Sequence, residues 1–339
     1  MSDATLSDTE SADVPRAIAN NRYAYLSAEE QGQLKTPSDL QGFLGFAVTW
    51  IVIIGCFILV AYWPNPFSIL IALTILGGRQ LALGILLHDC SHRSWFKTSG
   101  FNEFFGHWFA GIPVLVPLLF YRDYHFIHHT KTGTNEDPDV GNIKSYPVSK
   151  ASMRRKMMRD FVGLTGIKNM IALLLYVNTG RPGNAVSMGA HKKKITGRQM
   201  LKISVKNYSH LFLFHGLCIA IFTYLGHPAL YFLWWAAFIF TYPFIMRVRQ
   251  IAEHGAMPIL SSTDVRDNTR TTLPAWWERI FFAPHRVNYH CEHHYIPTVP
   301  GYNLPKMHAL MRARGFYQSK EAALAYGYRA AFQRAILPS

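Results

Sequence analysis

The sequence predicts an all-α membrane protein with four transmembrane helices in two hairpins, a re-entrant or interfacial helix segment and a helical cytoplasmic cap. Half of its 339 residues are hydrophobic and only 16% are charged, whereas about a quarter of the residues in a soluble domain are charged. Long uncharged stretches are joined by very short turns. Histidines also gather in three short windows near the expected ends of these stretches.

The first hairpin covers residues 43–88. Residues 43–63 carry no charge over 21 positions, and a helix of that length measures about 31 Å, enough to cross the hydrocarbon core of a bilayer. The turn Pro-Asn-Pro at 64–66 is too short for anything except a reversal. Residues 67–88 are therefore expected to return to the starting side.

The second hairpin repeats this pattern with spans at 211–225 and 229–246, joined by Gly-His-Pro at 226–228. Both reversing turns lack Lys and Arg, whereas the loop 131–208 contains fifteen of them. Because basic residues accumulate on the cytoplasmic side, the loop and both termini are expected there. The membrane is expected to be a bacterial cytoplasmic membrane, with the endoplasmic reticulum as the alternative.

Residues 101–120 form an apolar stretch that is long enough to cross but contains Glu103, His107 and two prolines. An interrupted, polar stretch makes a poor span, so a re-entrant or interfacial helix pair is expected. Residues 152–164 mix basic and apolar side chains at helical spacing. They fit either a helix lying on the lipid headgroups or an ordinary packing helix.

Three parts of the chain are expected to differ in character. Residues 1–40 are a disordered or interfacial cytoplasmic segment, since the first 22 lack the basic start and apolar core of a secretory signal. Residues 41–315 form the membrane domain, and 316–339 form a C-terminal cytoplasmic helix.

The four cysteines show no framework spacing and are expected to be reduced. Although the net charge is +14, long apolar runs interrupt the basic stretches, so no nucleic-acid partner is expected.

The three histidine windows, 88–92, 125–129 and 290–294, contain eight of the sixteen histidines. In a helix, positions i, i+3 and i+4 share one face, so each window directs its rings the same way. Adjacent buried imidazoles are costly unless their lone pairs are bound, and a metal cation binds them while the opposite ring nitrogen donates to an acceptor. The predicted ligands are His88, His92, His125, His128, His129, His290, His293 and His294.

His254 adds a ninth imidazole just beyond the end of the fourth span, with Gln250 one turn earlier. A single tetrahedral zinc uses three or four ligands, so nine imidazoles favour two redox-active ions. Imidazole suits Fe, Cu and Zn alike, which leaves the metal open. Asp89, Asp123 and Glu292 lie in or beside the windows and are candidate acceptors for the outer ring nitrogens.

The windows HDCSH, HFIHH and HCEHH, together with NEDPD after the second and YIPTVPGYNLPKMH after the third, resemble the histidine boxes of the integral-membrane fatty acid desaturase and hydroxylase superfamily. The two continuations also resemble those of the bacterial acyl-lipid members. The resemblance covers residues 40–315. It implies a non-haem di-iron centre held by the eight box histidines, with His254 as the additional ligand. In relatives of the acyl-CoA type, an Asn at the position of Gln250 holds a metal-bound water. This chain has Gln there, so that contact is not carried over.

The resemblance further implies an O2-dependent desaturation of a lipid-linked or thioester-linked acyl chain. A hydroxylase or carotenoid-type oxygenase is the alternative on the same scaffold, and a membrane metal transporter is a more remote one. Electrons are expected from a separate ferredoxin, rubredoxin or cytochrome b5-type protein. An acyl tunnel between the spans is expected to involve Trp234, Trp235 and Phe238, or these side chains face lipid. Arg79 is expected to have a structural role or to contact substrate. The basic run 191–194 is expected either to keep its loop on the cytoplasmic side or to bind a docking partner.

Overall fold

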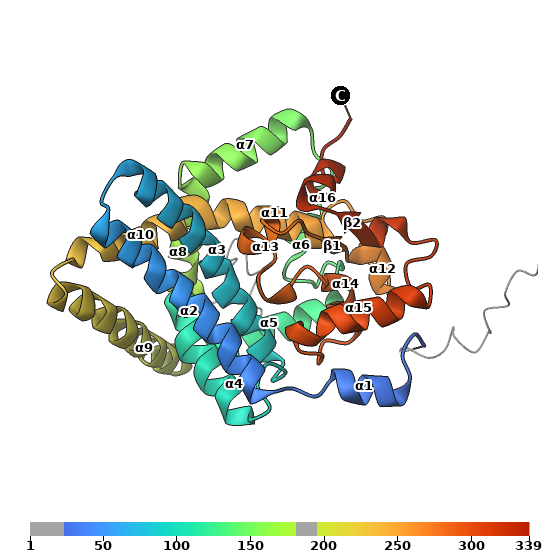
Figure 1. Cartoon of the computed structure of the whole chain (residues 1–339), viewed down its shortest axis with the longest axis horizontal. Helices are drawn as coiled ribbons and strands as arrows, with labels where there is room; N and C mark the ends of the chain where they lie inside the picture. Colours follow the sequence, from blue (N-terminus) through green and yellow to red (C-terminus); the bar gives the residue numbers. More distant parts are fainter. Residues whose placement is uncertain (1–23, 181–194, 339) are drawn as a thin grey trace, which may run out of the picture.

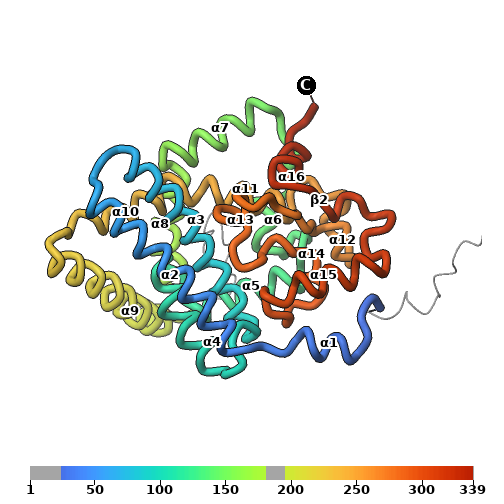
Figure 2. Tube along the Cα trace, viewed as in Figure 1, coloured from blue at the N-terminus to red at the C-terminus, as the bar shows by residue number. Residues whose placement is uncertain are grey.

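The computed structural model describes residues 24–180 and 195–338, and it is mostly helical (Figure 1). Long helices gather on one side of the molecule, and shorter elements form a cap on the other (Figures 1 and 2). The expectations for residues 1–23 and for the basic run 191–194 lie outside the described residues. The long-helix side contains α2 (Asp39–Tyr62), α3 (Pro66–Ser91), α9 (Gly197–Tyr224), η5 (Pro228–Tyr231), α10 (Phe232–Ala236), η6 (Ala237–Thr241) and α11 (Tyr242–His254).

Among the described residues, three helical runs are long and apolar enough to cross a membrane: α2, α3 and the run Pro228–His254. The second and third contain the predicted spans 67–88 and 229–246, and α2 covers the predicted span 43–63 except for its last residue. The predicted span 211–225 lies within α9, which is not one of the three, so the four-span arrangement remains a prediction. Two bent helix pairs raise the number of candidate spans to five if each pair counts as one.

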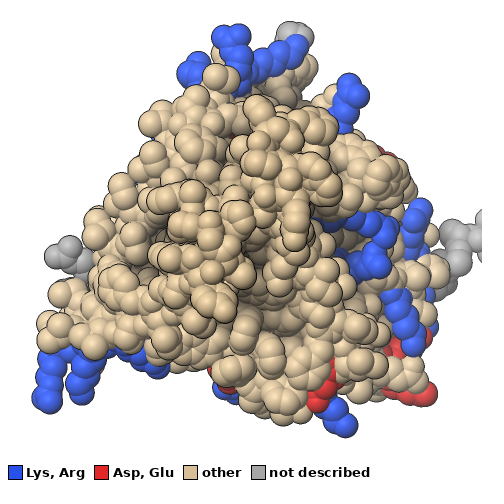
Figure 3. Space-filling view, turned by 60° about the vertical axis from the view of Figure 1, so that its left-hand side comes forward, with Lys and Arg blue, Asp and Glu red and all other residues tan. Residues whose placement is uncertain are grey.

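Short sequence signals set the starts of the long helices. The Asn65 side chain accepts hydrogen bonds from the backbone N–H groups of Phe67 and Ser68, and Pro66 occupies the first helical position of α3. Thr196 and Gln199 cap each other at the start of α9. Ile51 of α2 and Phe212 of α9 are 66% and 74% exposed. Lys and Arg lie along the margins of this face, whose middle is uncharged (Figure 3), as expected of a surface that contacts lipid.

The stretch 101–120 forms the first bent pair. It runs through α4 (Ser99–Phe105), η2 (Gly106–Gly111) and η3 (Ile112–Val114), then turns by 90° into α5 (Leu118–Lys131). Leu115 at the bend has a positive φ of 66°. Gly106 packs so tightly against α3 that a Cβ would lie 2.5 Å from the Cβ of Cys90. This close approach packs η2 against the end of α3. The bent pair fits either a broken span or a re-entrant segment, so the re-entrant arrangement remains a prediction.

The second bent pair consists of α7 (Lys150–Phe161) and α8 (Leu164–Ala172), which continues into η4 (Leu173–Val177). The predicted helix 152–164 is therefore interrupted, at Gly163 with φ +82°. Asp160 of α7 pairs with Arg247 of α11 at 2.8 Å, while Met158 and Phe161 are exposed. The helix thus packs on α11 and also presents apolar side chains outward.

The cap adds two short strands to the predicted all-α fold, and this is a correction. Strand β1 (Thr271–Leu273) pairs in parallel with β2 (Leu324–Tyr326). Three-residue strands from distant parts of the chain are too short to leave a periodic signal. The predicted C-terminal helix over 316–339 is limited to α16 (Tyr328–Arg334), after η9 (Glu321–Ala323) and β2. The other cap elements are α1 (Ala28–Leu34), α6 (Val140–Ile143), α12 (Val265–Asn268), α13 (Glu278–Phe281), η7 (Pro284–Arg286), α14 (His290–Tyr295), η8 (Gly301–Asn303) and α15 (Leu304–Ala313).

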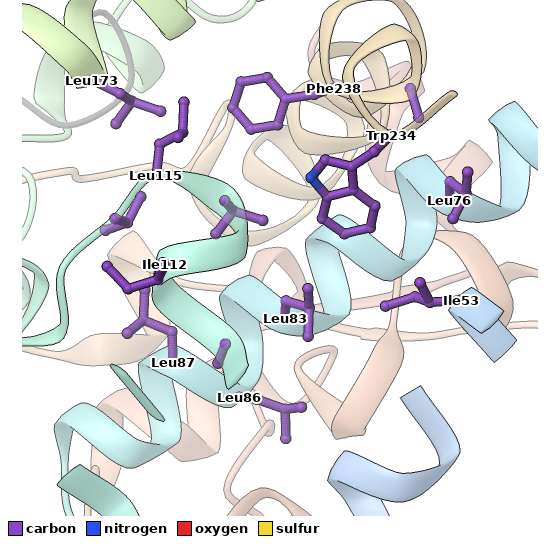
Figure 4. Packing of buried hydrophobic residues seen from close by; sticks show 14 of the residues in the cluster. Ile53, Leu76, Leu83, Leu86, Leu87, Ile112, Leu115, Leu173, Trp234 and Phe238 are labelled. Atoms are coloured by element: carbon purple, nitrogen blue, oxygen red, sulfur yellow. The ribbon is translucent and has the colours of Figure 1, made fainter. Parts of the chain in front are cut away.

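The largest apolar core lies between α2, α3, the η2–η3 segment, η4 and α10. Its central side chains interdigitate across these elements (Figure 4). The buried members labelled there are Ile53, Leu76, Leu83, Leu86, Leu87, Ile112, Leu115, Leu173, Trp234 and Phe238. This core fixes α3 against the η2–η3 segment, and the histidine windows lie at the edge of the core.

Candidate metal centre

The nine predicted histidine ligands come from the ends of two long helices and from two shorter helices. His88 lies in the last turn of α3 and His92 caps that helix. His254 ends α11, while α5 and α14 carry the second and third windows. Each window is helical or ends a helix, so the spacing of three and four residues gathers its rings on one face, as predicted.

Five of the histidines form one group, in which one ring nitrogen of each lies within 4.8 Å of those of the others. The members of this five-histidine group are His88, His92, His125, His129 and His293. The Nε2 atom of His129 lies 2.9 Å from that of His125 and 3.0 Å from that of His293. The rings of His88 and His293 are 4.3 Å apart, centre to centre.

The other four form a second group within the same distance limit. The members of this four-histidine group are His128, His254, His290 and His294, and all four are buried. The Nε2 atoms of His254 and His290 are 2.7 Å apart. The two groups adjoin, because the rings of His129 and His294 are 4.4 Å apart.

Several outer ring nitrogens face an acceptor instead of the centre. His88 Nδ1 lies 2.6 Å from Asp89 Oδ1, and His128 Nδ1 lies 2.9 Å from Asp137 Oδ1. His254 Nδ1 lies 2.9 Å from the backbone oxygen of Asn268. If each Nδ1 donates to its acceptor, each Nε2 is left with a lone pair directed inward, the arrangement that metal-bound histidines adopt.

The remaining inward nitrogens show how well this set fits a cation. The Nε2 atoms of His88, His92 and His294 are buried and have no hydrogen-bond partner among the described residues. Leaving a buried polar atom unpaired costs free energy, and a bound metal ion removes that cost. Two adjoining groups of imidazoles suit two ions of Fe, Cu or Zn.

Burial favours the neutral, ligand-competent form of most of these rings. At His128 burial acts in the same direction, but the hydrogen bond with Asp137 and the nearby carboxylates raise the pKa. Burial, reinforced by neighbouring imidazoles, lowers the pKa of His290, His293 and His294 well below its ordinary value. Burial and the nearby Arg122 lower the pKa of His92 to about 3. Burial alone would raise the pKa of Asp137, but its hydrogen bond and charge interaction with His128 and the backbone N–H groups of Gly133 and Asp139 together outweigh burial, so the pKa falls. The carboxylate beside His128 is thus kept charged.

The structure separates the four predicted supporting residues. Asp89 contacts a window histidine, His88. Asp123 is exposed on the outer side of α5. Glu292 is fully buried but accepts from His308 Nδ1 at 2.5 Å and from Tyr317 and Thr271, so it anchors α14 to the cap. Gln250 lines a cavity beside the centre.

Three acidic residues around the four-histidine group were missed by the sequence-based prediction. They are Asp137, Asp139 and Glu253. Asp139 Oδ2 lies 3.7 Å from His128 Nδ1, and Glu253 Oε1 lies 3.8 Å from His290 Nδ1. Glu253 also pairs with Arg249 at 2.7 Å. The acidic run directly after the second window was the available signal for Asp137 and Asp139.

A cavity leads from the histidines into the apolar core. It begins at His125, His128, His254 and His290 and passes between α3, the bend between η3 and α5, α8 and α11. Its remaining lining residues are Leu81, Gly84, Ile85, Leu87, Val114, Val116, Tyr121, Tyr124, Asp139, Asn142, Ile143, Asn169, Leu173, Phe238, Tyr242, Met246, Arg249, Gln250 and Glu253. Polar side chains surround the histidine end, and aliphatic or aromatic side chains line the deep end.

The other side chains singled out from the sequence are distributed around this cavity. Phe238 lines it, whereas Trp234 lines a neighbouring cavity and Trp235 packs against His215. Arg79 is buried and donates to the backbone oxygen of Ile280. That contact ties α3 to the cap, which agrees with the structural alternative given for Arg79.

Comparison with known proteins gives a consistent set of matches. A family model described as fatty acid desaturase matches residues 61–329, a range that includes all nine histidines. Dihydrorhizobitoxine desaturase from Bradyrhizobium elkanii is 25% identical over 282 residues, covering 80% of this chain and 75% of that protein. The sn-1 oleoyl-lipid 12-desaturase of Synechocystis sp. is 23% identical over 232 residues, 66% and 63% of the two chains. The sn-1 acyl-lipid omega-3 desaturase (ferredoxin) of Synechocystis sp. is 36% identical over 118 residues, 33% and 32% of the two chains.

Proposed function

The chain belongs to the fatty acid desaturase family, and from this premise we propose that it forms a double bond in a lipid-linked acyl chain at a di-iron centre on the cytoplasmic side of the membrane. It is an oxidoreductase. The observation that carries the proposal is the convergence of nine histidines into two adjoining groups. No side chain can oxidise an unactivated methylene, and a histidine-bound iron pair with O2 supplies that chemistry when it is present.

The protein's own residues position the reaction. Asp89 and Asp137 fix the ring orientation of His88 and His128 through the outer nitrogens. The cavity that starts at His125 and His128 receives the acyl chain, and its apolar walls exclude water from the reacting carbons. This placement selects which pair of methylenes lies next to the metal centre.

Substrate and electron donor are proposed from the relatives. Two of them are named as acyl-lipid or oleoyl-lipid desaturases, and one name specifies ferredoxin. We assign an acyl-lipid substrate and a ferredoxin-type donor, with rubredoxin or a cytochrome b5-type protein as alternatives. Removing two hydrogens from the substrate provides two electrons and two protons. The donor provides two more electrons, two further protons come from solvent, and O2 is reduced to two waters.

The cytoplasmic location follows from charge and topology together. His88 and His254 lie at the ends of α3 and α11, two of the membrane-spanning candidates. The loop between the re-entrant segment and α9 carries the basic residues, and such residues remain on the cytoplasmic side. Ligands at helix ends also favour an enzyme over a metal transporter, whose sites lie near the bilayer midplane.

A lipid profile tests the proposal. Whole-lipid mass spectrometry compares a host with and without the chain, and the expected product is lighter than its substrate by two hydrogens. His128→Ala is expected to reduce product by more than about 100-fold, because even outer residues of a metal site contribute roughly 10–100-fold. His227→Ala, an exposed histidine away from both groups, serves as the matched control and should retain activity.

Metal analysis of the purified protein provides a second readout. Two irons per chain are expected in the wild type and fewer in His128→Ala. A product that gains oxygen would identify a hydroxylase instead. Unchanged lipids together with metal flux across vesicles would overturn the enzyme assignment in favour of transport.

A further inference from the structure

Two cavities approach each other at Trp234, on the membrane side of the metal centre. The deep end of the cavity that starts at the histidines is formed by Leu81, Val114 and Phe238. A second, apolar cavity lies between α2, α9 and η5, and its wall includes Pro113 and Trp234. Val114 directly follows Pro113, and Phe238 lies one helical turn after Trp234. The contact between Pro113 and Trp234 therefore separates the two cavities.

Trp234 is fixed in this position by hydrogen bonds at both ends. Its indole Nε1 donates to the backbone oxygen of Pro113 at 3.1 Å, and its own backbone oxygen accepts from Gln80 Nε2 at 2.8 Å. The side chain is 3% exposed. In Figure 4 the indole projects from its helix toward the segment that carries Ile112 and Leu115. A large and rigid side chain thus forms the partition.

Gly84 has the opposite property at the histidine end of the same cavity. It precedes His88 by four residues and therefore lies on the same face of α3. Gly84 lines the cavity, and a Cβ built there meets no atom within 4 Å. Any side chain at this position would enter the cavity one turn from a metal-binding histidine.

We infer that Trp234 closes the far end of the acyl-binding cavity and limits how much of the chain extends past the metal centre, while Gly84 keeps the passage to that end open. The inference rests on the proposed function. Gln80, which holds Trp234, precedes His88 by eight residues, so the closed end lies about 12 Å from the metal centre along α3. The segment between the reacting carbons and the methyl end of the acyl chain must fit within this depth.

Enlarging the closed end is the direct test. Trp234→Ala is expected to join the two cavities, so the protein accepts longer chains and leaves more methylenes between the double bond and the methyl end. Each methylene newly accommodated should change the ratio of long-chain to original product by roughly tenfold. Product length and double-bond position are measured by mass spectrometry of host lipids. Trp234→Phe is a smaller change and should shift the products in the same direction. It replaces the alanine variant as the test if that variant does not fold.

Blocking the passage is the complementary test. Gly84→Leu is expected to lower product formation at least tenfold while iron content and unfolding temperature stay near those of the wild type. Gly55→Leu is the matched control, because Gly55 is an exposed glycine of α2 whose Cβ would also meet no atom within 4 Å. It should keep the wild-type activity and product pattern.

A binding measurement separates this inference from the proposed function. Saturated fatty acids of increasing length are added to the purified protein, and the rise in unfolding temperature is recorded. The stabilisation should stop growing at a certain length in the wild type and at a greater length in Trp234→Ala. A wild type that binds in this way but forms no product contradicts the proposed function alone. Unchanged length limits and products in both Trp234 variants, or full activity in Gly84→Leu, overturn the role of this cavity.

Discussion

The two histidine groups adjoin, yet they differ in exposure and in the charges around them. In the five-histidine group His92 and His129 are partly exposed, whereas every member of the four-histidine group is buried. Asp89 is the carboxylate that contacts a ring of the first group. Around the second group the cap and α11 place Asp137, Asp139 and Glu253.

This difference indicates unequal metal sites within one centre. The pKa of Asp137 is lowered by its contacts with His128 and the backbone, so this carboxylate stays charged beside the four-histidine group, favours a cation there and fixes the ring of His128. Burial of the group slows the access of water and chelators. The five-histidine group has fewer supporting charges and a more open edge. We therefore expect the four-histidine group to hold its ion more firmly, and the following predictions test that contrast.

Acid should abolish the difference between the two histidine groups, because both contain histidines whose protonation opposes folding and metal binding. The expected loss of stability is the largest effect predicted here. Burial lowers the pKa of His92 in the first group and of His290 and His294 in the second. Burial and the charge of Arg79 also lower the pKa of His285 to about 3. The pKa of histidine in the unfolded chain is about 6.5. Below that pH the unfolded chain binds protons that the folded chain does not, so stability falls as pH falls.

Each such histidine lowers the free energy of unfolding by up to about 1.4 kcal/mol per pH unit, so several act together between pH 6.5 and 5.5. The measurement is the unfolding temperature of chelated protein in detergent at pH 7.5, 6.5 and 5.5. Iron-loaded protein is the control. Its loss of stability should begin at a lower pH than that of the chelated protein, because the metal competes with protons for the ring nitrogens. A chelated protein that is equally stable at all three values would contradict the prediction.

Removing one supporting charge should weaken the four-histidine group. Asp137→Asn removes the carboxylate that contacts His128 at 2.9 Å, and a loss of roughly 10–100-fold in iron affinity or activity is expected. Iron per chain and product formation are measured together. Asp123→Asn is the matched control, since Asp123 lies on the same helix as His128 but is exposed. Equal losses in both variants would contradict the assignment of Asp137.

Chelation at neutral pH should reveal the difference between the two histidine groups as a difference in the rate of ion release. This effect is expected to be smaller than those of acid and of Asp137→Asn. Because His92 and His129 are partly exposed, the ion of the five-histidine group is expected to leave first, at a rate several-fold higher than the second ion. Iron content followed over time should show two phases, with about one iron per chain between them. Release of both ions in a single phase would show that the two groups behave as one site.

Much of the centre could be predicted from local sequence, because the helix alone decides which side chains share a face. The spacing in the windows 88–92, 125–129 and 290–294 is sufficient to predict three ligand patches. The position of His254 about two helical turns beyond the apolar run 229–246 also predicts that it lies near a membrane surface. Long apolar runs likewise predict α2, α3 and the run Pro228–His254 without tertiary information.

The supporting residues could not be predicted in the same way. Asp123 is two residues from His125 and yet points outward, whereas Asp137 reaches His128 because the chain turns back after α5. Glu292 lies within the third window but contacts His308 and Tyr317 instead of a ligand ring. Distance along the chain is a poor guide once the contact depends on how a loop folds.

The sequence by itself determined the helical class, the apolar runs and the nine clustered imidazoles, because these depend on composition and on the period of a helix. Tertiary structure decided how the histidines divide into five and four, which carboxylates support them, and that Trp234 and not Trp235 lines the second cavity. These features are set by packing between segments far apart in the chain, such as Trp234 against Pro113, and no local pattern encodes that contact.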